Sequence, residues 1–188
     1  MQAAITLLLL CAGLAVGRPA VQAVGPCTKL SSSTTKWDVV DFGYSATSDS
    51  SAGSKANATT TDGSGGTIRF RLANAAVEYK ANCSAQSADG PDFFDGKREY
   101  ACSVPVQGDK ATFTFSRQTG RLHIKQMWRC AKEFTGFQAE GGIALNLTCG
   151  EGGQRRTSSP LRRQTAVSKI LCDNSPLSVP IENLSAFA

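Results

Sequence analysis

The chain contains a single histidine, His123, and this count limits the catalysis that its side chains can support. A ribonuclease-like hydrolase would use His123 as a general base or acid, with Glu99 or Glu133 as its partner and Arg or Lys side chains to steady the phosphate. Leu122 and Ile124 flank His123 in an alternating run, so in a strand they take the opposite face and His123 lies on the surface. Nothing in the spacing brings either glutamate to His123. We therefore predict no catalytic residues and no enzyme activity.

Other reaction chemistries and metal binding are also disfavoured. The sequence lacks the Gly-x-Ser-x-Gly pattern of serine hydrolases, and no cysteine pair has the spacing of zinc ligands. Asp89, Asp92 and Asp95 recur at every third position and carry oxygen ligands that suit Ca²⁺, but the pattern is not that of an EF-hand. We interpret this segment as a polar hairpin loop, and we predict no metal and no cofactor. Phe93 and Phe94 lie at its tip and are predicted to contact a partner.

An apolar run precedes most of the cysteines. Residues 5–16 are too short for a membrane span, which needs about 20 residues, but they suit the core of a signal peptide. We predict a signal peptide over residues 1–17, with cleavage before Arg18 or as late as residue 23. Cys11 is one of seven cysteines and lies in this leader, which leaves six in the mature chain. An even number of cysteines in an exported chain is usually oxidised to bridges. We expect a secreted, extracellular protein with no membrane span.

The apolar residues alternate with polar ones almost throughout the chain, and no segment has a helical period. Short alternating runs separated by Gly, Asp and Pro predict an all-β fold, an antiparallel barrel or sandwich. We expect one domain over residues 24–172, with a mobile loop at 45–66, a basic loop at 150–164 and a C-terminal tail at 173–188. The loops are predicted because both segments lack the apolar residues that a core needs.

The charge of the chain is mildly basic, with a formal net charge of +5 from 20 basic and 15 acidic side chains. Such a balance serves solubility or attraction to an acidic polysaccharide, and we expect no nucleic-acid partner. Two arginine pairs lie in the expected basic loop. They fit a solvated loop, a dibasic processing site or an anion-binding contact for a partner; the pairs are Arg155, Arg156, Arg162 and Arg163. Four Asn-x-Ser/Thr sequences are candidate glycosylation sites, at Asn57, Asn82, Asn146 and Asn183.

Several short motifs occur in the same order as in a known family. These are Trp37–Phe42, Gly65–Phe70, Asn82–Asp89, Tyr100–Ser103 and the hairpin residues Phe113–Phe115 and Leu122–Gln126, followed by Cys149 and Cys172. Over these residues the chain resembles the Alternaria major-allergen family of secreted fungal proteins, which includes elicitors of plant immunity.

The resemblance implies a β-barrel and a disulfide pairing. It implies the bridges Cys83–Cys102 and Cys149–Cys172, and we pair the remaining Cys27 with Cys130. Six cysteines permit 15 pairings, so spacing alone does not choose among them. Some family members use an N-terminal cysteine to link two subunits, and Cys27 could do so here.

The function that we expect is that of a secreted fungal effector or elicitor, which binds without catalysis. Its partner would be a host plant apoplastic or cell-surface protein, or a wall polysaccharide. Two alternatives stay open: a small-molecule carrier that uses a barrel or dimer cavity, and the ribonuclease-like hydrolase that uses His123. We expect a monomer or a disulfide-linked dimer.

Overall fold

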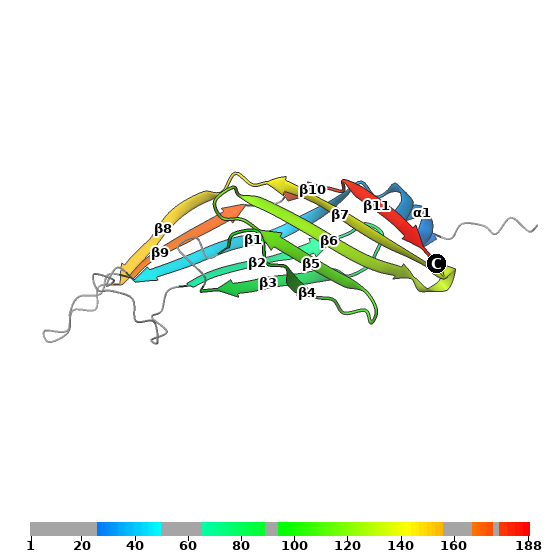
Figure 1. Ribbon diagram of the computed structural model, residues 1–188, viewed down its shortest axis with the longest axis horizontal. Coiled ribbons are helices and arrows are strands. Elements are labelled where there is room, and N and C mark those ends of the chain that lie inside the picture. The colour runs from blue at the N-terminus through cyan, green and yellow to red at the C-terminus, as the bar shows by residue number, and fades with distance from the viewer. Residues whose placement is uncertain (1–25, 50–64, 89–93, 156–166, 175–176) are drawn as a thin grey trace, which may run out of the picture.

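The structure is a computed structural model that describes residues 26–49, 65–88, 94–155, 167–174 and 177–188 (Figure 1). It is mostly antiparallel β-structure, which confirms the predicted fold class. The elements in chain order are α1 (Pro26–Ser33), β1 (Lys36–Asp49), β2 (Gly65–Ala73), β3 (Lys80–Ser87), β4 (Tyr100–Ser103), β5 (Lys110–Phe115), β6 (Arg121–Cys130), the short 3-10 helix η1 (Ala131–Glu133), β7 (Thr135–Ala144), β8 (Thr148–Arg155), β9 (Val167–Asn174), β10 (Leu177–Pro180) and β11 (Asn183–Phe187). No helix in this part of the chain is long and apolar enough to cross a membrane.

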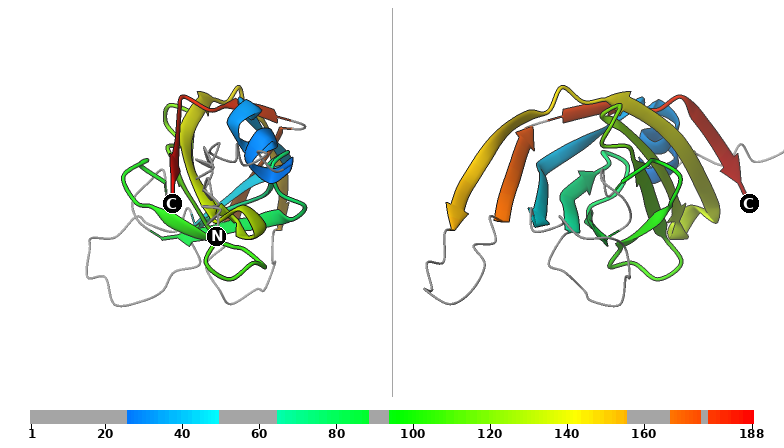
Figure 2. Two further views of the ribbon diagram at one scale, coloured as in Figure 1. Left: turned by 90° about the vertical axis from the view of Figure 1, so that its right-hand side faces the viewer. Right: turned by 60° about the vertical axis from the view of Figure 1, so that its left-hand side comes forward.

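The strands form one curled sheet, a half barrel, in the order β11-β7-β6-β5-β4-β3-β2-β1-β9-β8, with β10 also paired to β1. Because β3 to β7 follow one another as neighbours, most of the sheet is a meander of antiparallel hairpins. Figure 2 shows how the meander curls around the interior, with α1 at one end. The strands β9 and β8 extend the sheet along the second half of β1.

The expected C-terminal tail belongs to the sheet instead. Residues 177–180 pair with the start of β1, and residues 183–187 pair with β7. This segment therefore joins β1 to β7 across one end of the half barrel. The approach is close: a Cβ on Gly141 of β7 would lie 2.1 Å from the carbonyl oxygen of Pro180. Val179 of this segment is fully buried and anchors it.

The two expected loops are shorter than predicted, because their ends are strands. Ser45–Asp49 and Gly65–Gly66 extend β1 and β2, with Ser45 opposite both Thr67 and Leu171. Residues 150–155 extend β8. Backbone hydrogen bonds to neighbouring strands hold these polar residues, and such bonds need no apolar side chain. Residues 50–64 and 156–166 lie outside the described part of the chain.

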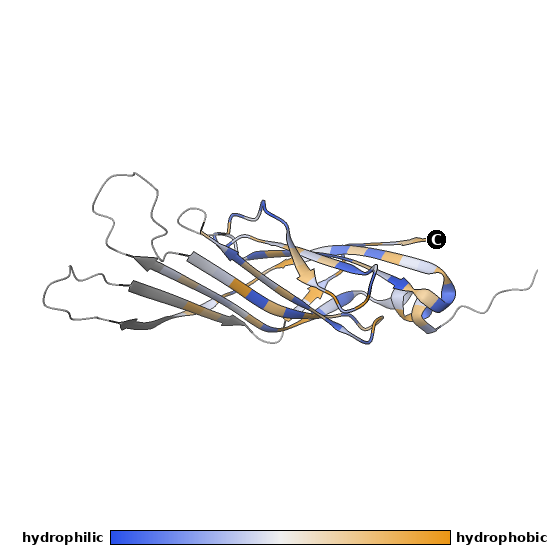
Figure 3. Ribbon diagram, turned by 90° about the horizontal axis from the view of Figure 1, so that it is seen from below, coloured by the Kyte–Doolittle hydropathy of each residue, from blue (hydrophilic) through white to orange (hydrophobic). Residues whose placement is uncertain are grey.

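The core lies on the inner face of the sheet. Along β3, β5 and β6 the exposed and buried residues alternate, as the period-two pattern predicts. Figure 3 shows the corresponding bands of polar and apolar residues along the strands. Aromatic rings fill much of the interior, with centroids of neighbouring rings 4.9 to 6.2 Å apart; they are Phe42, Tyr44, Phe70, Phe94, Tyr100, Phe113 and Phe115.

The helix α1 was not predicted, because its eight residues carry no apolar stripe. Tertiary contacts hold it in place. Cys27 is bridged to Cys130 at the end of β6. Ser31 is fully buried, and its hydroxyl accepts a hydrogen bond of 2.9 Å from the indole Nε1 of Trp128. A short helix without an amphipathic face is marginal alone, so these contacts account for its formation.

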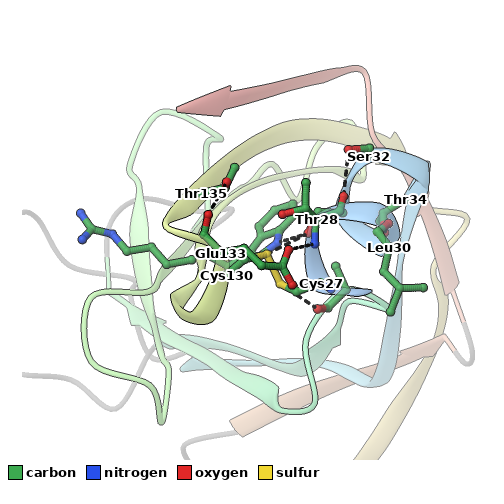
Figure 4. Close-up of a disulfide and its surroundings, with 12 residues drawn as sticks. Cys27, Thr28, Leu30, Ser32, Thr34, Cys130, Glu133 and Thr135 are labelled. Atoms are coloured by element: carbon green, nitrogen blue, oxygen red, sulfur yellow. Dashed lines mark hydrogen bonds between the residues drawn. A yellow bond between two sulfur atoms is a disulfide. The ribbon is translucent and has the colours of Figure 1, made fainter. Parts of the chain in front are cut away.

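The carboxylate of Glu133 caps the first turn of this helix (Figure 4). One oxygen accepts a hydrogen bond from the backbone N–H of Thr28 at 2.7 Å, and the other accepts one from the N–H of Cys27 at 3.2 Å. These amides have no partner within the helix, so an anion at this end is favourable. The contacts with Thr28, through its side chain and then its amide, and with the Cys27 amide hold the pKa of Glu133 below its ordinary value, against an opposing effect of desolvation.

Candidate functional site

All six cysteines in the described part of the chain form bridges, and the three pairs are the expected ones: Cys27–Cys130, Cys83–Cys102 and Cys149–Cys172. The second and third pairs are cross-strand bridges with Cα–Cα distances of 4.2 and 4.1 Å, between β3 and β4 and between β8 and β9. The first pair ties α1 to β6. Cys27 is thus joined within its own chain, and the alternative of a link between two subunits through Cys27 is not the arrangement found.

The hydrolase alternative depended on His123 and a nearby carboxylate. His123 lies on the outer face of β6, opposite Thr114 and Gly142. Glu99 contacts Thr112 and Lys125, and Glu133 is held by the helix amides. Among the described residues, His123 has no hydrogen bond or ion pair to either glutamate. The structure therefore does not assemble the set that this chemistry needs.

The prediction for Phe94 was wrong, because its side chain is only 2 % exposed. Its ring packs edge-on against Tyr44, Tyr100 and Phe115 at 5.6 to 6.1 Å between centroids. The carbonyl of Phe94 also accepts a hydrogen bond from the N–H of Arg117, which fixes this segment to the end of β5. Phe93, Asp89 and Asp92 lie outside the described residues. No group of three or more potential metal ligands occurs in the described part of the chain.

The arginine pairs are mostly outside the described residues. Arg155 is the last residue of β8 and pairs through its backbone with Val167, while Arg156, Arg162 and Arg163 are not described. Three candidate glycosylation sites are exposed: Asn82 on β3, Asn146 before β8 and Asn183 on β11. The amide of Asn183 donates a hydrogen bond to Glu140, and Asn57 lies outside the described residues.

A partly buried polar cluster lies near the C-terminal end of β6. The hydroxyl of Tyr79 donates a hydrogen bond of 2.6 Å to Asp109, whose second oxygen accepts one of 3.0 Å from the N–H of Arg129. Burial, and then the contact with Asp109, raises the pKa of Tyr79. Each of these polar groups is hydrogen-bonded to another member of the cluster. We therefore interpret the cluster as structural support for the turn before β5.

The outer face has a groove where β1 is irregular. Between Val40 and Gly43 the register of β1 against β2 shifts by one residue, which is a β-bulge. Beside it lies a groove of about 500 Å³ over β1, β2 and β3. It is lined by Asp41, Phe42, Gly43, Arg69, Phe70, Arg71, Asn82, Cys83 and Ser84. Phe42, Phe70 and Cys83 are buried, so the polar residues of this set present the side chains of the groove.

The bulge places Asp41 in an unusual conformation. Its φ of 56° is left-handed, and only Phe134 shares this property among the described residues other than glycine. Such a conformation costs an L-residue roughly 1–2 kcal/mol, which glycine avoids. The carboxylate forms an ion pair with Arg71, but both side chains are about half exposed, and exposed pairs contribute about 0–1 kcal/mol. The ion pair alone does not account for a charged residue at this position.

The side chains of the groove form two similar rows across the sheet. Arg71 is opposite Asn82, and Arg69 is opposite Ser84. Each row carries one guanidinium, which donates hydrogen bonds to carboxylates, and one neutral group that bonds hydroxyls. The groove was not predicted from the sequence. The sequence does contain one sign of the bulge. The buried apolar residues of β1 are spaced by two positions, except for the three-residue step from Val39 to Phe42.

Comparison with known proteins places the chain in a family. The model of the family described as Alternaria alternata allergen 1 matches residues 39–160, which is more than half of the chain and includes β1 from Val39 onward, β2 to β8 and the groove. Searches of curated proteins and of solved structures found no match. Because the family match covers most of the sheet and most of the motifs that carry the resemblance, the chain belongs to the Alternaria alternata allergen 1 family.

Proposed function

We propose that this protein is secreted and acts outside the cell by binding a component of a host surface or cell wall, without catalysis. The observation that carries the proposal is membership of the allergen family together with three bridges that use every cysteine after the leader. Bridges of this kind persist in oxidising surroundings such as the extracellular space. In its finer form, the proposal is that of a fungal effector or elicitor in contact with a plant.

The arrangement of the side chains supports binding over the alternatives. Neither glutamate contacts the single histidine, which gives the hydrolase alternative no geometric support. Aromatic rings occupy the interior that a carrier would leave open for a ligand. The outer face, with its groove of about 500 Å³, is then the surface that a partner meets. The proposed partners are a host plant apoplastic or cell-surface protein, or a wall polysaccharide.

The experiment is infiltration of the purified, bridge-intact protein into leaf tissue of several plant hosts. We expect cell death or an oxidative burst, lost when the same protein is reduced and alkylated before infiltration. A His123→Ala variant is the matched control and should act like the parent. Absence of a response in every host would contradict the elicitor role, and loss of the response in the His123→Ala variant would contradict the non-catalytic one.

A further inference from the structure

We propose that the groove beside the bulge binds a sugar polymer that carries carboxylates, that is, a chain of uronic acid units. This inference rests on the proposed function, because it names the chemical class of the extracellular partner. Arg69 and Arg71 would bind carboxylates, while Asn82 and Ser84 would bind sugar hydroxyls. The groove lies over β1, β2 and β3, which are neighbouring strands in Figure 1, and its exposed side chains alternate along β2 and β3 with the buried residues of the core.

The groove repeats the same pair of side-chain types along the strands. Arg69 and Arg71 are two residues apart on β2, so they project from the same face, roughly 7 Å apart along the strand. Their partners across the pair, Ser84 and Asn82, are two residues apart on β3. The groove therefore presents one cation and one neutral hydrogen-bonding group, and then presents them again. A polymer that carries carboxylates and hydroxyls along its whole length can contact both rows at once.

Asp41 helps to orient the guanidinium of Arg71. A guanidinium binds a carboxylate through two parallel hydrogen bonds, which requires the plane of the group to be fixed. The ion pair with Asp41 restrains Arg71, and the left-handed backbone of Asp41 turns its carboxylate toward the groove. The lone pairs of Asp41 that Arg71 leaves unused can accept hydrogen bonds from sugar hydroxyls. This role accounts for an aspartate at a position where glycine would be less strained.

The groove is open to a ligand from solvent. Gly43 lies opposite Arg69 on the other side of β2 and has no side chain, so a ligand can approach the backbone there. The side chains of Arg69, Asn82 and Ser84 are exposed. Asn82 is also a candidate glycosylation site, and a glycan on it would fill the groove. The protein used for binding therefore needs to be made without N-glycosylation.

The test is isothermal titration calorimetry of the full mature chain, bridge-intact and unglycosylated, with a decamer of galacturonic acid. The matched ligand is the same decamer with its carboxylates methyl-esterified. The site variant is Arg69→Gln/Arg71→Gln. The control variant is Arg121→Gln, which removes an exposed arginine that is also ion-paired, to Glu182, on the outer face of β6. Circular dichroism confirms that both variants are folded.

We expect the parent to bind the free acid, with at least a tenfold loss of affinity for the site variant and for the methyl ester, and less than a twofold change for Arg121→Gln. Asp41→Gly, which keeps the left-handed backbone, should weaken binding severalfold without lowering the melting temperature. Absence of binding by the parent would overturn the proposal. An equal loss for both arginine variants, or equally tight binding of dextran sulfate, would also overturn it, since either means general attraction of polyanions.

These outcomes are separate from those of the proposed function. A parent protein that ignores the galacturonate decamer but still triggers a leaf response retains its extracellular role and acts through another partner. A protein that binds the decamer at the groove but gives no response in leaves loses the elicitor role and keeps the site.

Discussion

The bridge between Cys27 and Cys130 should contribute more to stability than either cross-strand bridge. It spans 103 residues, whereas Cys83–Cys102 spans 19. Cys83 and Cys102 both lie between Cys27 and Cys130. When their bridge is intact, it shortens the loop that the long bridge closes in the unfolded chain by 19 residues. In the chain-entropy account, the long closure then contributes about 4.5 kcal/mol and the short one about 3 kcal/mol.

The perturbation is the double replacement Cys27→Ser/Cys130→Ser, with Cys83→Ser/Cys102→Ser as the matched control. The free energy of unfolding is measured in guanidinium chloride from tryptophan fluorescence. Loss of the long bridge should lower it by about 4.5 kcal/mol, and the melting temperature by roughly 10–15 °C. Loss of the short bridge should lower the free energy by about 3 kcal/mol. Loss of the long bridge should also make the free energy of unfolding fall more steeply with denaturant concentration, because the unfolded chain without this bridge exposes more surface.

The same experiment separates chain entropy from loss of the helix contact. Trp128 is fully buried and donates its hydrogen bond to Ser31 of α1. If the helix leaves the sheet when the bridge is removed, the native emission of the double variant shifts to longer wavelength before any denaturant is added. A loss no larger than that of the short-bridge control, with no spectral shift, would refute the reasoning.

Three further perturbations test other parts of the structure. Glu133→Gln should make the melting temperature depend less on pH in the acid range. The carboxylate of the parent protein has a pKa that is lower in the folded than in the unfolded state. Its stabilising effect is therefore present above the unfolded-state pKa and is lost as the pH falls through the folded-state pKa. A parent and variant with parallel profiles would contradict this. The free energy of unfolding, measured with denaturant, should be about 1 kcal/mol higher for Asp41→Gly than for Asp41→Ala, because the φ of residue 41 is 56°. Equal stabilities of the two variants would mean that the bulge rearranges. Gly141→Ala should cost about 2 kcal/mol, since its Cβ would lie 2.1 Å from the oxygen of Pro180, whereas Gly150→Ala has no neighbour within 4 Å and should cost little.

The sequence predicted the strands well where side chains determine the structure. The alternation in Phe113–Phe115 and around Leu122 follows directly from burial on one face, and the structure confirms it. The strand ends at Ser45–Asp49 and Gly150–Arg155 were assigned to loops, because their backbone pairing leaves no apolar pattern in the sequence. The helix α1 likewise depends on tertiary contacts, a bridge and a buried serine, that no local pattern predicts.

The candidate site was predicted less well, for a related reason. Phe94 reads as exposed when a loop is judged by composition, yet its ring completes the aromatic core. The groove gathers residues from three strands, and only the register places Arg71 beside Asn82. A register is a long-range property, fixed by which face each strand buries. The sequence therefore shows the two arginines and the asparagine of the groove, but it does not show that they lie close together.

The bulge links the groove to the core. Val39 and Phe42 are three residues apart, and both are buried, so a regular strand would turn one of them to solvent. The extra residue lets both side chains stay inside, and the same extra residue turns Asp41 outward to Arg71. Regular pairing of the same sequence would turn the rings of Phe42 and Tyr44 to solvent, whereas deletion of one bulge residue would keep both rings inside and remove only the bulge. In this sequence, burial of both Val39 and Phe42 on one face thus requires the irregularity beside which the proposed sugar site lies.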